Sequence, residues 1–115
     1  MEFTDSLKLN YEFRRAYRKG RSAAEPCLVV YARRNGKAGN RLGFAVSNKL
    51  GSAVVRDRVR RRLREIYRLN ESRLCRGHDV VVVARSRSVG ADYQRLEREF
   101  LRACAELGLV KESET

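Results

Sequence analysis

The chain has 115 residues, 43% of them hydrophobic, which is enough apolar material for one ordinary core and not for two. Lysine and arginine number 26 against 14 acidic residues, and the formal net charge of +12 favours a polyanionic partner, above all a nucleic acid. The chain has no tryptophan, no apolar run approaching roughly 18 residues and no signal-peptide pattern, so it is expected to be a cytoplasmic single domain over 1–115 without a membrane partner.

The first element expected is a helix that begins after Asn10, as N-cap, and ends at Gly20, as a left-handed C′ residue. Its apolar residues Phe13, Ala16 and Tyr17 recur at helical spacing. Two interpretations of the aromatic pair stay open: it packs in the core, or it offers ring faces on which unpaired bases stack.

Two strands are expected next, over 27–33 and 41–47, and the Asn- and Gly-rich segment 35–40 between them predicts that they pair as a hairpin. Side chains alternate along a strand, so the second strand should place larger apolar residues on one face and small ones on the other. The small face leaves room for something flat, and it comprises Gly43, Ala45 and Ser47.

The segment from Ser52 to about Leu69 predicts an arginine-rich helix, with a core stripe of Val55, Val59, Leu63 and Ile66. Like charges one turn apart cost roughly 0.2–0.5 kcal/mol per pair, so this density of cations indicates an external polyanion. Helical spacing puts four charged residues together opposite the stripe: Asp57, Arg61, Arg64 and Arg68. The seven arginines are Arg56, Arg58, Arg60, Arg61, Arg62, Arg64 and Arg68.

A continuous apolar run over 80–84 predicts an interior strand, covered on both faces. A last helix is expected over 91–107, stopped by Gly108, followed by a frayed polar tail after Val110. The order helix, strand, strand, helix, strand, helix predicts an α+β fold, in which helices cover a small mixed sheet.

No set of residues suited to catalysis is evident. The acids Asp92, Glu97 and Glu99 are expected to be exposed on the last helix, in ion pairs with neighbouring arginines. His78, the only histidine, is expected to be a turn residue at a strand entrance. The three cysteines, Cys27, Cys75 and Cys104, are widely spaced and odd in number, which favours reduced thiols and gives no ordinary metal site.

The string from Asn48 to Glu65, NKLGSAVVRDRVRRRLRE, resembles the signature of the bacterial ribonuclease P protein subunit, whose centre is Arg-Asn-Arg followed by further basic residues. The upstream segment LKLNYEFRRAYRKG, over 7–20, is similar to that family's opening helix. The resemblance covers about 7–107. One departure is Asp57, where the family usually has Asn; an ion pair with Arg61 is the favoured interpretation, and a hydrated magnesium ion is the alternative.

The resemblance implies a protein that assists a catalytic RNA, which cuts the 5′ leader from precursor tRNA and binds most of the magnesium; no organic cofactor is implied. It also implies a fold like a domain of ribosomal protein S5, with a left-handed crossover. By position, the leader-binding residues would be Phe13, Tyr17, Tyr31, Ser47, Asn48 and Lys49. Those that touch the catalytic RNA would be Arg56, Asp57, Arg58, Arg60, Arg61, Arg62, Arg64 and Arg68. The rival hypothesis is a structural RNA-binding protein of the ribosomal kind, with no processing role.

Overall fold

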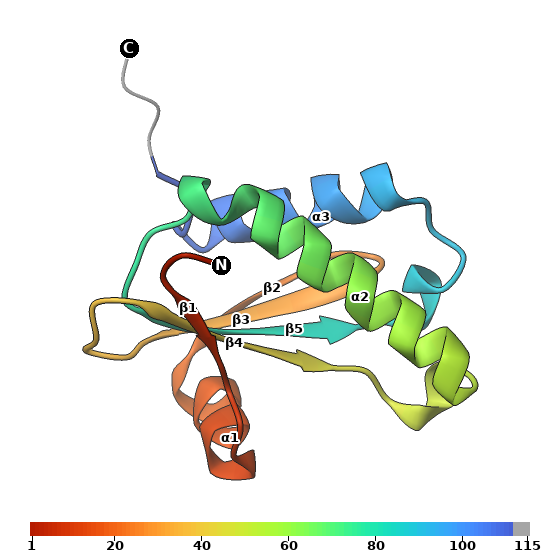
Figure 1. Cartoon of the computed structure of the whole chain (residues 1–115), viewed down its shortest axis with the longest axis horizontal. Helices are drawn as coiled ribbons and strands as arrows, with labels where there is room; N and C mark the ends of the chain where they lie inside the picture. Colours follow the sequence, from red (N-terminus) through yellow and green to blue (C-terminus); the bar gives the residue numbers. More distant parts are fainter. Residues whose placement is uncertain (112–115) are drawn as a thin grey trace.

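The computed structural model describes residues 1–111, and the last part of the predicted tail, 112–115, lies outside them. A five-stranded mixed sheet carries helix α1 on one face and helices α2 and α3 on the other (Figure 1). The elements are β1 (Thr4–Ser6), α1 (Asn10–Lys19), β2 (Arg21–Ala24), β3 (Leu28–Arg34), β4 (Asn40–Ala45), α2 (Ala53–Asn70), β5 (His78–Ala84) and α3 (Tyr93–Glu106). Short 3-10 helices lie at Asn48–Leu50, Glu71–Arg73 and Ser86–Ser88.

The strand order is β1-β4-β5-β3-β2, so the predicted hairpin between β3 and β4 is wrong. Strand β5 lies between them, antiparallel to β3 and parallel to β4. The run of four valines explains this: a strand so apolar is most stable in the centre of the sheet, where both of its edges are paired. The crossover between parallel neighbours runs from β4 through α2 to β5. Two short strands were not predicted, namely β1, which pairs with β4, and β2, which pairs with β3.

The main core lies between the sheet and helices α2 and α3. The predicted stripe of α2 is largely confirmed, since Val59, Leu63 and Ile66 are buried and Val55 is half-buried. Tyr67 is also fully buried, and its ring meets that of Phe100 on α3 edge to face at 6.1 Å. No helix among residues 1–111 is long and apolar enough to cross a membrane.

All three cysteines are free thiols. Cys27 and Cys104 are buried in the core, whereas Cys75 is half-buried at the end of a loop. Burial raises the pKa of Cys27, and it raises that of Cys104 to about 12. Neither buried thiol therefore has thiolate character near neutral pH.

The helix ends agree only partly with the predicted caps. Helix α2 starts near Ser52 as expected, and Ser52 caps it, because its Oγ accepts a hydrogen bond from the Val55 N–H at 3.4 Å. Asn10 is not a cap but the first residue of α1, and the carboxylate of Glu12 instead accepts the N–H groups before the helix. Gly20 has extended backbone and not the left-handed one; a side chain is excluded there because a Cβ would lie 2.4 Å from the Ala16 carbonyl oxygen.

The acids of α3 differ from the prediction of an exposed row. Glu99 is only 2% exposed, and it accepts hydrogen bonds from the Cys27 N–H at 2.7 Å and from Arg95 Nε at 2.9 Å. Asp92 caps the helix, its Oδ1 accepting from the Arg95 N–H at 2.8 Å. Glu97 accepts from Asn70 Nδ2 at 2.9 Å. The three carboxylates therefore have structural roles, but the predicted exposed ion pairs are wrong: among residues 1–111 only Glu99 of the three pairs with an arginine side chain, and it is buried.

Candidate RNA-binding surfaces

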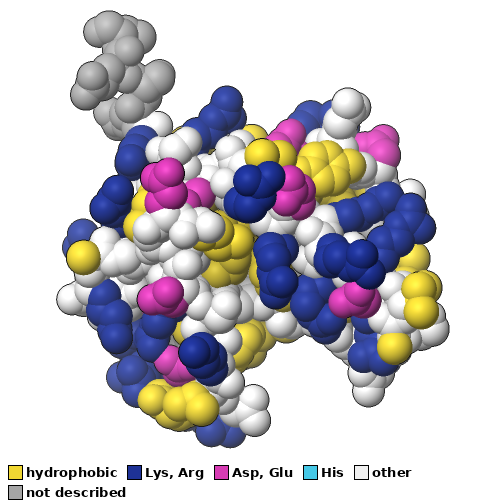
Figure 2. Space-filling model, viewed as in Figure 1, with side chains coloured by type: hydrophobic (Ala, Val, Ile, Leu, Met, Phe, Trp, Pro, Cys, Tyr) yellow, Lys and Arg dark blue, Asp and Glu magenta, His cyan; other side chains and the backbone are white. Residues whose placement is uncertain are grey.

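Helix α2 presents an exposed arginine face, which we define as Arg58, Arg61, Arg64 and Arg68 with the half-buried Arg60. Three of these, Arg61, Arg64 and Arg68, belong to the group predicted opposite the buried stripe, and they are exposed. Dark blue side chains gather over α2 in the space-filling view (Figure 2). A guanidinium group donates in a planar fork that suits phosphate oxygens, so this face is chemically fitted to bind a phosphate backbone.

Two of the predicted RNA-binding arginines are turned toward the protein. Arg62 Nη1 donates to the Ala91 carbonyl oxygen at 3.1 Å, which ties α2 to the loop before α3. Arg56 Nη1 donates to Asn48 Oδ1 at 2.8 Å, and its Nε donates to the Gly51 carbonyl oxygen at 3.3 Å. These two side chains therefore have hydrogen-bond partners within the protein.

Asp57 pairs with arginine, which agrees with the favoured interpretation. Its Oδ2 accepts from Arg61 Nε at 3.0 Å and from Nη2 at 2.6 Å, while Arg60 Nη1 lies 3.9 Å from Oδ1. The hydrogen bonds from Arg61 lower the pKa of Asp57. Arg68 makes the same kind of pair with Glu65. Both pairs orient guanidinium groups on the arginine face without removing them from solvent.

The opposite face of the sheet, toward α1, carries three rows of side chains that run across β3, β5 and β4. We call them the ionic row, the middle row and the open row. Strand register aligns their members in the order β3, β5, β4: Arg33, Asp79 and Arg41; Tyr31, Val81 and Gly43; and Val29, Val83 and Ala45.

Helix α1 covers the first two of these rows and leaves the third uncovered. Its Glu12 pairs with Arg41, and its Ala16 packs with the fully buried Val81. The residues of the open row are only half-buried, although Val83 belongs to the central strand. The prediction that the run 80–84 is covered on both sides is therefore wrong at Val83. A half-exposed apolar row beside a helix is a floor on which flat, uncharged groups fit.

The predicted aromatic residues border this floor. The rings of Tyr17 and Tyr31 meet edge to face, with centroids 4.9 Å apart and planes at 76°. Phe13 and Tyr31 are half-buried and pack against the small cluster of Leu7, Ala16 and Val81, while Tyr17 is 38% exposed. The packing interpretation is therefore confirmed in part, because the rings help fix α1 to the sheet, while base stacking on their exposed surface stays a prediction.

Gly43 is the small residue against which Phe13 lies. A Cβ at this position would be 2.5 Å from Cε1 and Cζ of the Phe13 ring. The alternation predicted for this strand is confirmed, because Leu42, Phe44 and Val46 belong to the main core on the other face. The small face of β4 accommodates an aromatic ring of the protein at Gly43 and is half-exposed at Ala45.

Three of the predicted leader-binding residues, Ser47, Asn48 and Lys49, form the turn between β4 and α2. Ser47 Oγ accepts from the Lys49 N–H at 3.2 Å, which starts the short 3-10 helix. Asn48 is joined to Arg56, as described above, so this turn connects the end of β4 to the first turn of α2. The Lys49 side chain is exposed.

A hollow of about 230 Å³ links the two surfaces at the β1/β4 edge of the sheet. Its lining includes Phe13 and Gly43 from the α1 side and Arg60 and Arg64 from α2. Strand β1 has only three residues, which is why the edge of β4 beyond Ser6 stays open. The sequence did not predict this hollow, because it depends on how far β1 runs along β4.

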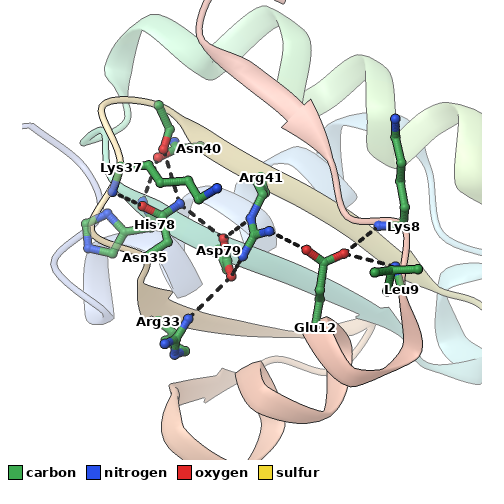
Figure 3. A network of polar contacts seen from close by, with 11 residues as sticks. Lys8, Leu9, Glu12, Arg33, Asn35, Lys37, Asn40, Arg41, His78 and Asp79 are labelled. Carbon is green, nitrogen blue, oxygen red and sulfur yellow. Dashed lines mark hydrogen bonds and ion pairs between the residues drawn. The ribbon is translucent and has the colours of Figure 1, made fainter.

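The ionic row holds the start of α1 to the centre of the sheet (Figure 3). Arg41 donates from Nε and Nη2 to the two carboxylate oxygens of Asp79, at 2.8 and 2.7 Å, and from Nη1 to Glu12. Glu12 in turn accepts the N–H groups of Lys8 and Leu9 at 3.0 and 2.9 Å. Asn35 Nδ2 also donates to Asp79 at 3.1 Å, and Arg33 lies 3.6 Å from it.

Both carboxylates of this network have lowered pKa values. For Glu12 the causes are the hydrogen bonds from the Leu9 and Lys8 backbone, together with the charge of Arg41. For Asp79, which is 1% exposed, burial alone would raise the pKa, but the hydrogen bonds from Arg41 and Asn35 outweigh it. The network is therefore ionised at neutral pH, as buried charges must be when they are fully paired.

Among residues 1–111 no three His, Cys, Asp or Glu side chains come together as a metal site. The carboxylates of Asp57, Glu71, Asp79 and Glu99 accept hydrogen bonds from arginines or from backbone N–H groups. The fold and its surfaces thus define a small, strongly basic α+β protein that is built to bind a polyanion.

Comparisons with known proteins identify the family within this class. The family model described as Ribonuclease P matches residues 1–108. The ribonuclease P protein component of Natranaerobius thermophilus is 41% identical over 108 residues, covering 94% of each chain. That of Clostridium acetobutylicum is 44% identical over 106 residues, covering 90% of this chain and 89% of its own.

Solved structures with a similar fold come from the same family. The RNase P protein of Staphylococcus aureus matches with a TM-score of 0.84 at 30% identity, over 92% of this chain and 97% of its own. That of Thermotoga maritima matches with a TM-score of 0.78 at 30% identity, over 85% of this chain and 93% of its own. The chain belongs to the bacterial ribonuclease P protein family, the protein component of a ribonucleoprotein endoribonuclease that processes the 5′ leader of tRNA. Membership implies the ribonuclease P RNA and precursor tRNA as partners.

Proposed function

We propose that the arginine face of α2 binds the catalytic RNA and that the open row, with Phe13, Tyr17 and Tyr31, binds the single-stranded leader of precursor tRNA. The turn Ser47–Lys49 would form the rim of the leader site. The protein then brings two polyanions together and favours precursor over mature tRNA, while the RNA subunit performs the cleavage and binds the magnesium that it needs.

The observation that carries this proposal is the hollow at the β1/β4 edge. Phe13, which borders the open row, shares it with Arg60 and Arg64 of the arginine face. One RNA strand lying on the open row would therefore approach the RNA bound along α2. A structural RNA-binding protein needs the arginine face but has no use for an apolar surface beside partly exposed aromatic rings.

The chemistry of the floor supports single-stranded RNA as its ligand. Bases that are not paired expose flat faces, and stacking on an aromatic side chain contributes about 1–3 kcal/mol per base. The open row is apolar and has aromatic neighbours on its α1 side. Lys49, exposed on the rim, is placed to meet phosphate groups of the same strand.

The proposal is tested by incubating precursor tRNA with the protein alone, with the catalytic RNA alone, and with both. We expect no cleavage by the protein alone, and we expect the protein to tighten binding of precursor more than of mature tRNA in the assembled complex. Equal tightening of both tRNAs would support the structural alternative, and cleavage without the RNA would contradict the proposal outright.

Replacing Phe13 and Tyr17 together by alanine should weaken binding of precursor tRNA roughly 10-fold, while binding of mature tRNA changes little. The readout is the ratio of the two affinities in the reconstituted complex. Tyr11→Ala is a matched control, because Tyr11 is an exposed aromatic residue of the same helix that borders neither the open row nor the hollow. Equal losses for both tRNAs would assign the two rings to packing alone.

A further inference from the structure

A second cluster of cations lies at the other end of the fold, away from the arginine face. A hollow of about 540 Å³ is lined by Lys19 from the end of α1, Arg21 from β2, Arg33 and Arg34 from β3, and His78 from β5. Its remaining lining residues are apolar, and none of those described is a carboxylate. We call it the β2/β3 hollow. In Figure 2 dark blue side chains also gather along the left side and around α1, apart from those over α2.

The charges of this hollow are poorly compensated within residues 1–111. Lys19 and Arg34 are exposed and take part in no ion pair there. Arg33 lies 3.6 Å from Asp79, but that carboxylate already accepts two shorter hydrogen bonds from Arg41. Arg21 donates from one nitrogen, Nη2, to the Leu107 carbonyl oxygen at the end of α3, which leaves its other donors free to bind a ligand.

His78 adds an observation that does not depend on charge. Its Nδ1 is buried and has no hydrogen-bond partner among the described residues. Buried polar atoms are nearly always paired, so this ring nitrogen would gain a partner if the imidazole turned toward a ligand in the hollow. Burial and the nearby charge of Arg34 lower the pKa of His78, and a bound phosphate would raise it again, so that the imidazole donates to a phosphate oxygen.

We infer that the β2/β3 hollow is a second binding site for the phosphate backbone of RNA, held by Lys19, Arg21, Arg33 and Arg34 with His78 at its base. This inference rests on the proposed function in one respect: it takes the ligand to be an RNA of the ribonuclease P reaction. The site lies across the sheet from the arginine face, because β2 and β3 form one side of the strand order and β4, which leads into α2, lies on the other. Two RNAs carry phosphate groups that this site would bind: the catalytic RNA, and a leader long enough to extend past α1.

The test compares three double variants of the full chain: Lys19→Ala with Arg34→Ala in the hollow, Arg61→Ala with Arg64→Ala on the arginine face, and Arg87→Ala with Arg98→Ala as a control. The control pair is exposed and removes the same charge from positions that line neither the hollow nor the arginine face. Affinities are measured for the catalytic RNA alone, and in the assembled complex for precursors with a short and with a long leader, at several salt concentrations.

We expect the hollow variant to bind at least one of these RNAs roughly 10-fold more weakly than the control variant, with the magnitude of its salt slope reduced by about 1.4, the value for two phosphate contacts on a single strand. A loss with the catalytic RNA alone identifies that RNA as the ligand, and a loss confined to the long leader identifies the leader. If the hollow variant matches the control throughout while the Arg61/Arg64 variant weakens, the inference is overturned and the proposed function stands. If neither weakens, both fail.

His78 provides a direct readout, because it is the only histidine of the chain. Its imidazole Cε1–Hε1 resonance in the full-length protein should shift saturably on titration with a single-stranded RNA oligonucleotide, and the control variant should behave in the same way. The shift should be lost in the Lys19/Arg34 variant. A resonance that is indifferent to RNA in the wild-type protein would contradict a ligand at this site.

Discussion

Gly43 determines where the Phe13 ring lies. The ring occupies the space that a Cβ would need, and Leu7 Cδ1 lies 3.1 Å from the same point. Both contacts are to the far ends of side chains, so an added methyl group would be accommodated by moving the ring and not the backbone. The position of a ring that borders the proposed leader site therefore depends on the absence of a side chain from the neighbouring strand.

Gly43→Ala should displace the Phe13 ring and lower the preference for precursor over mature tRNA, with a loss of only about 1 kcal/mol in the free energy of unfolding. Tight binding of the catalytic RNA alone should persist, because no residue of the arginine face has changed. Gly90→Ala is the control, since a Cβ there would meet nothing within 4 Å. An unchanged ratio of affinities would show that the ring position does not matter for discrimination.

Single residues were predictable where local chemistry decides their role. The helix start near Ser52, the helix stop at Gly108 and the pair of Asp57 with Arg61 all follow from neighbours within one turn, and all are confirmed. Gly20 and Glu99 could not be predicted, because their roles come from distant segments: the Ala32 carbonyl oxygen also crowds Gly20, and Glu99 binds the N–H of Cys27. The RNA contacts of the predicted binding residues stay predictions.

At the scale of elements, α1 is held to the sheet at its beginning by the ionic row and along its length by a small apolar cluster. That cluster has only three buried members, so removing one partner from the ionic row, which leaves a buried charge unpaired, should loosen the start of α1. Because Phe13 follows Glu12 directly, the same attachment fixes the aromatic border of the open row.

Asp79→Asn should lower the free energy of unfolding by about 3 kcal/mol at pH 7, because it removes one partner from a buried ion pair. Since the folded pKa values of Asp79 and Glu12 are both lowered, their stabilisation is present above the ordinary carboxyl range and is lost as pH falls below about 4. Urea unfolding of the two proteins should therefore differ most at neutral pH and converge in acid.

The exposed pair of Asp57 with Arg61 provides the control for this experiment, and Asp57→Asn should change unfolding little at either pH. A pH-independent difference between the wild type and Asp79→Asn would mean that the changed hydrogen-bond pattern of the amide, and not lost charge pairing, caused the effect.

Helices and the central strand were predictable from periodicity, whereas strand pairing was not. The boundaries of α2 and α3 lie within about two residues of those expected, because an apolar stripe and caps mark a helix locally. Which strands pair depends on contacts between distant segments. Strand β5 separates β3 and β4, although the turn-rich segment 35–40 between them predicts a hairpin. The open row and the ionic row follow from this register, and so they could not be seen in the sequence alone.

At the scale of the whole molecule, cations are distributed over two regions on different sides of one small sheet. A formal net charge of +12 opposes compaction by self-repulsion, and a bound polyanion relieves it. Association with RNA should therefore stabilise the fold as well as fix its orientation on the RNA.

Replacing Arg61 and Arg64 by alanine should weaken binding of the catalytic RNA and flatten the salt dependence of that binding, while the melting temperature of the free protein stays nearly unchanged. Both side chains are exposed, so little packing is lost. Affinity measured across a range of salt concentrations, together with thermal melting, separates the two effects. A large fall in the melting temperature would mean that these arginines stabilise the fold itself.

The unequal burial of the three thiols makes the wild-type chain suitable for labelling at one position. Cys27 and Cys104 are enclosed and have raised pKa values, so a maleimide dye should couple to Cys75 alone without mutagenesis. The N–H of Cys75 donates to the Leu109 carbonyl oxygen at 2.7 Å, and Leu109 also lines the β2/β3 hollow. A fluorophore at this position would report RNA arriving at that end of the molecule, by a signal independent of affinity measurements.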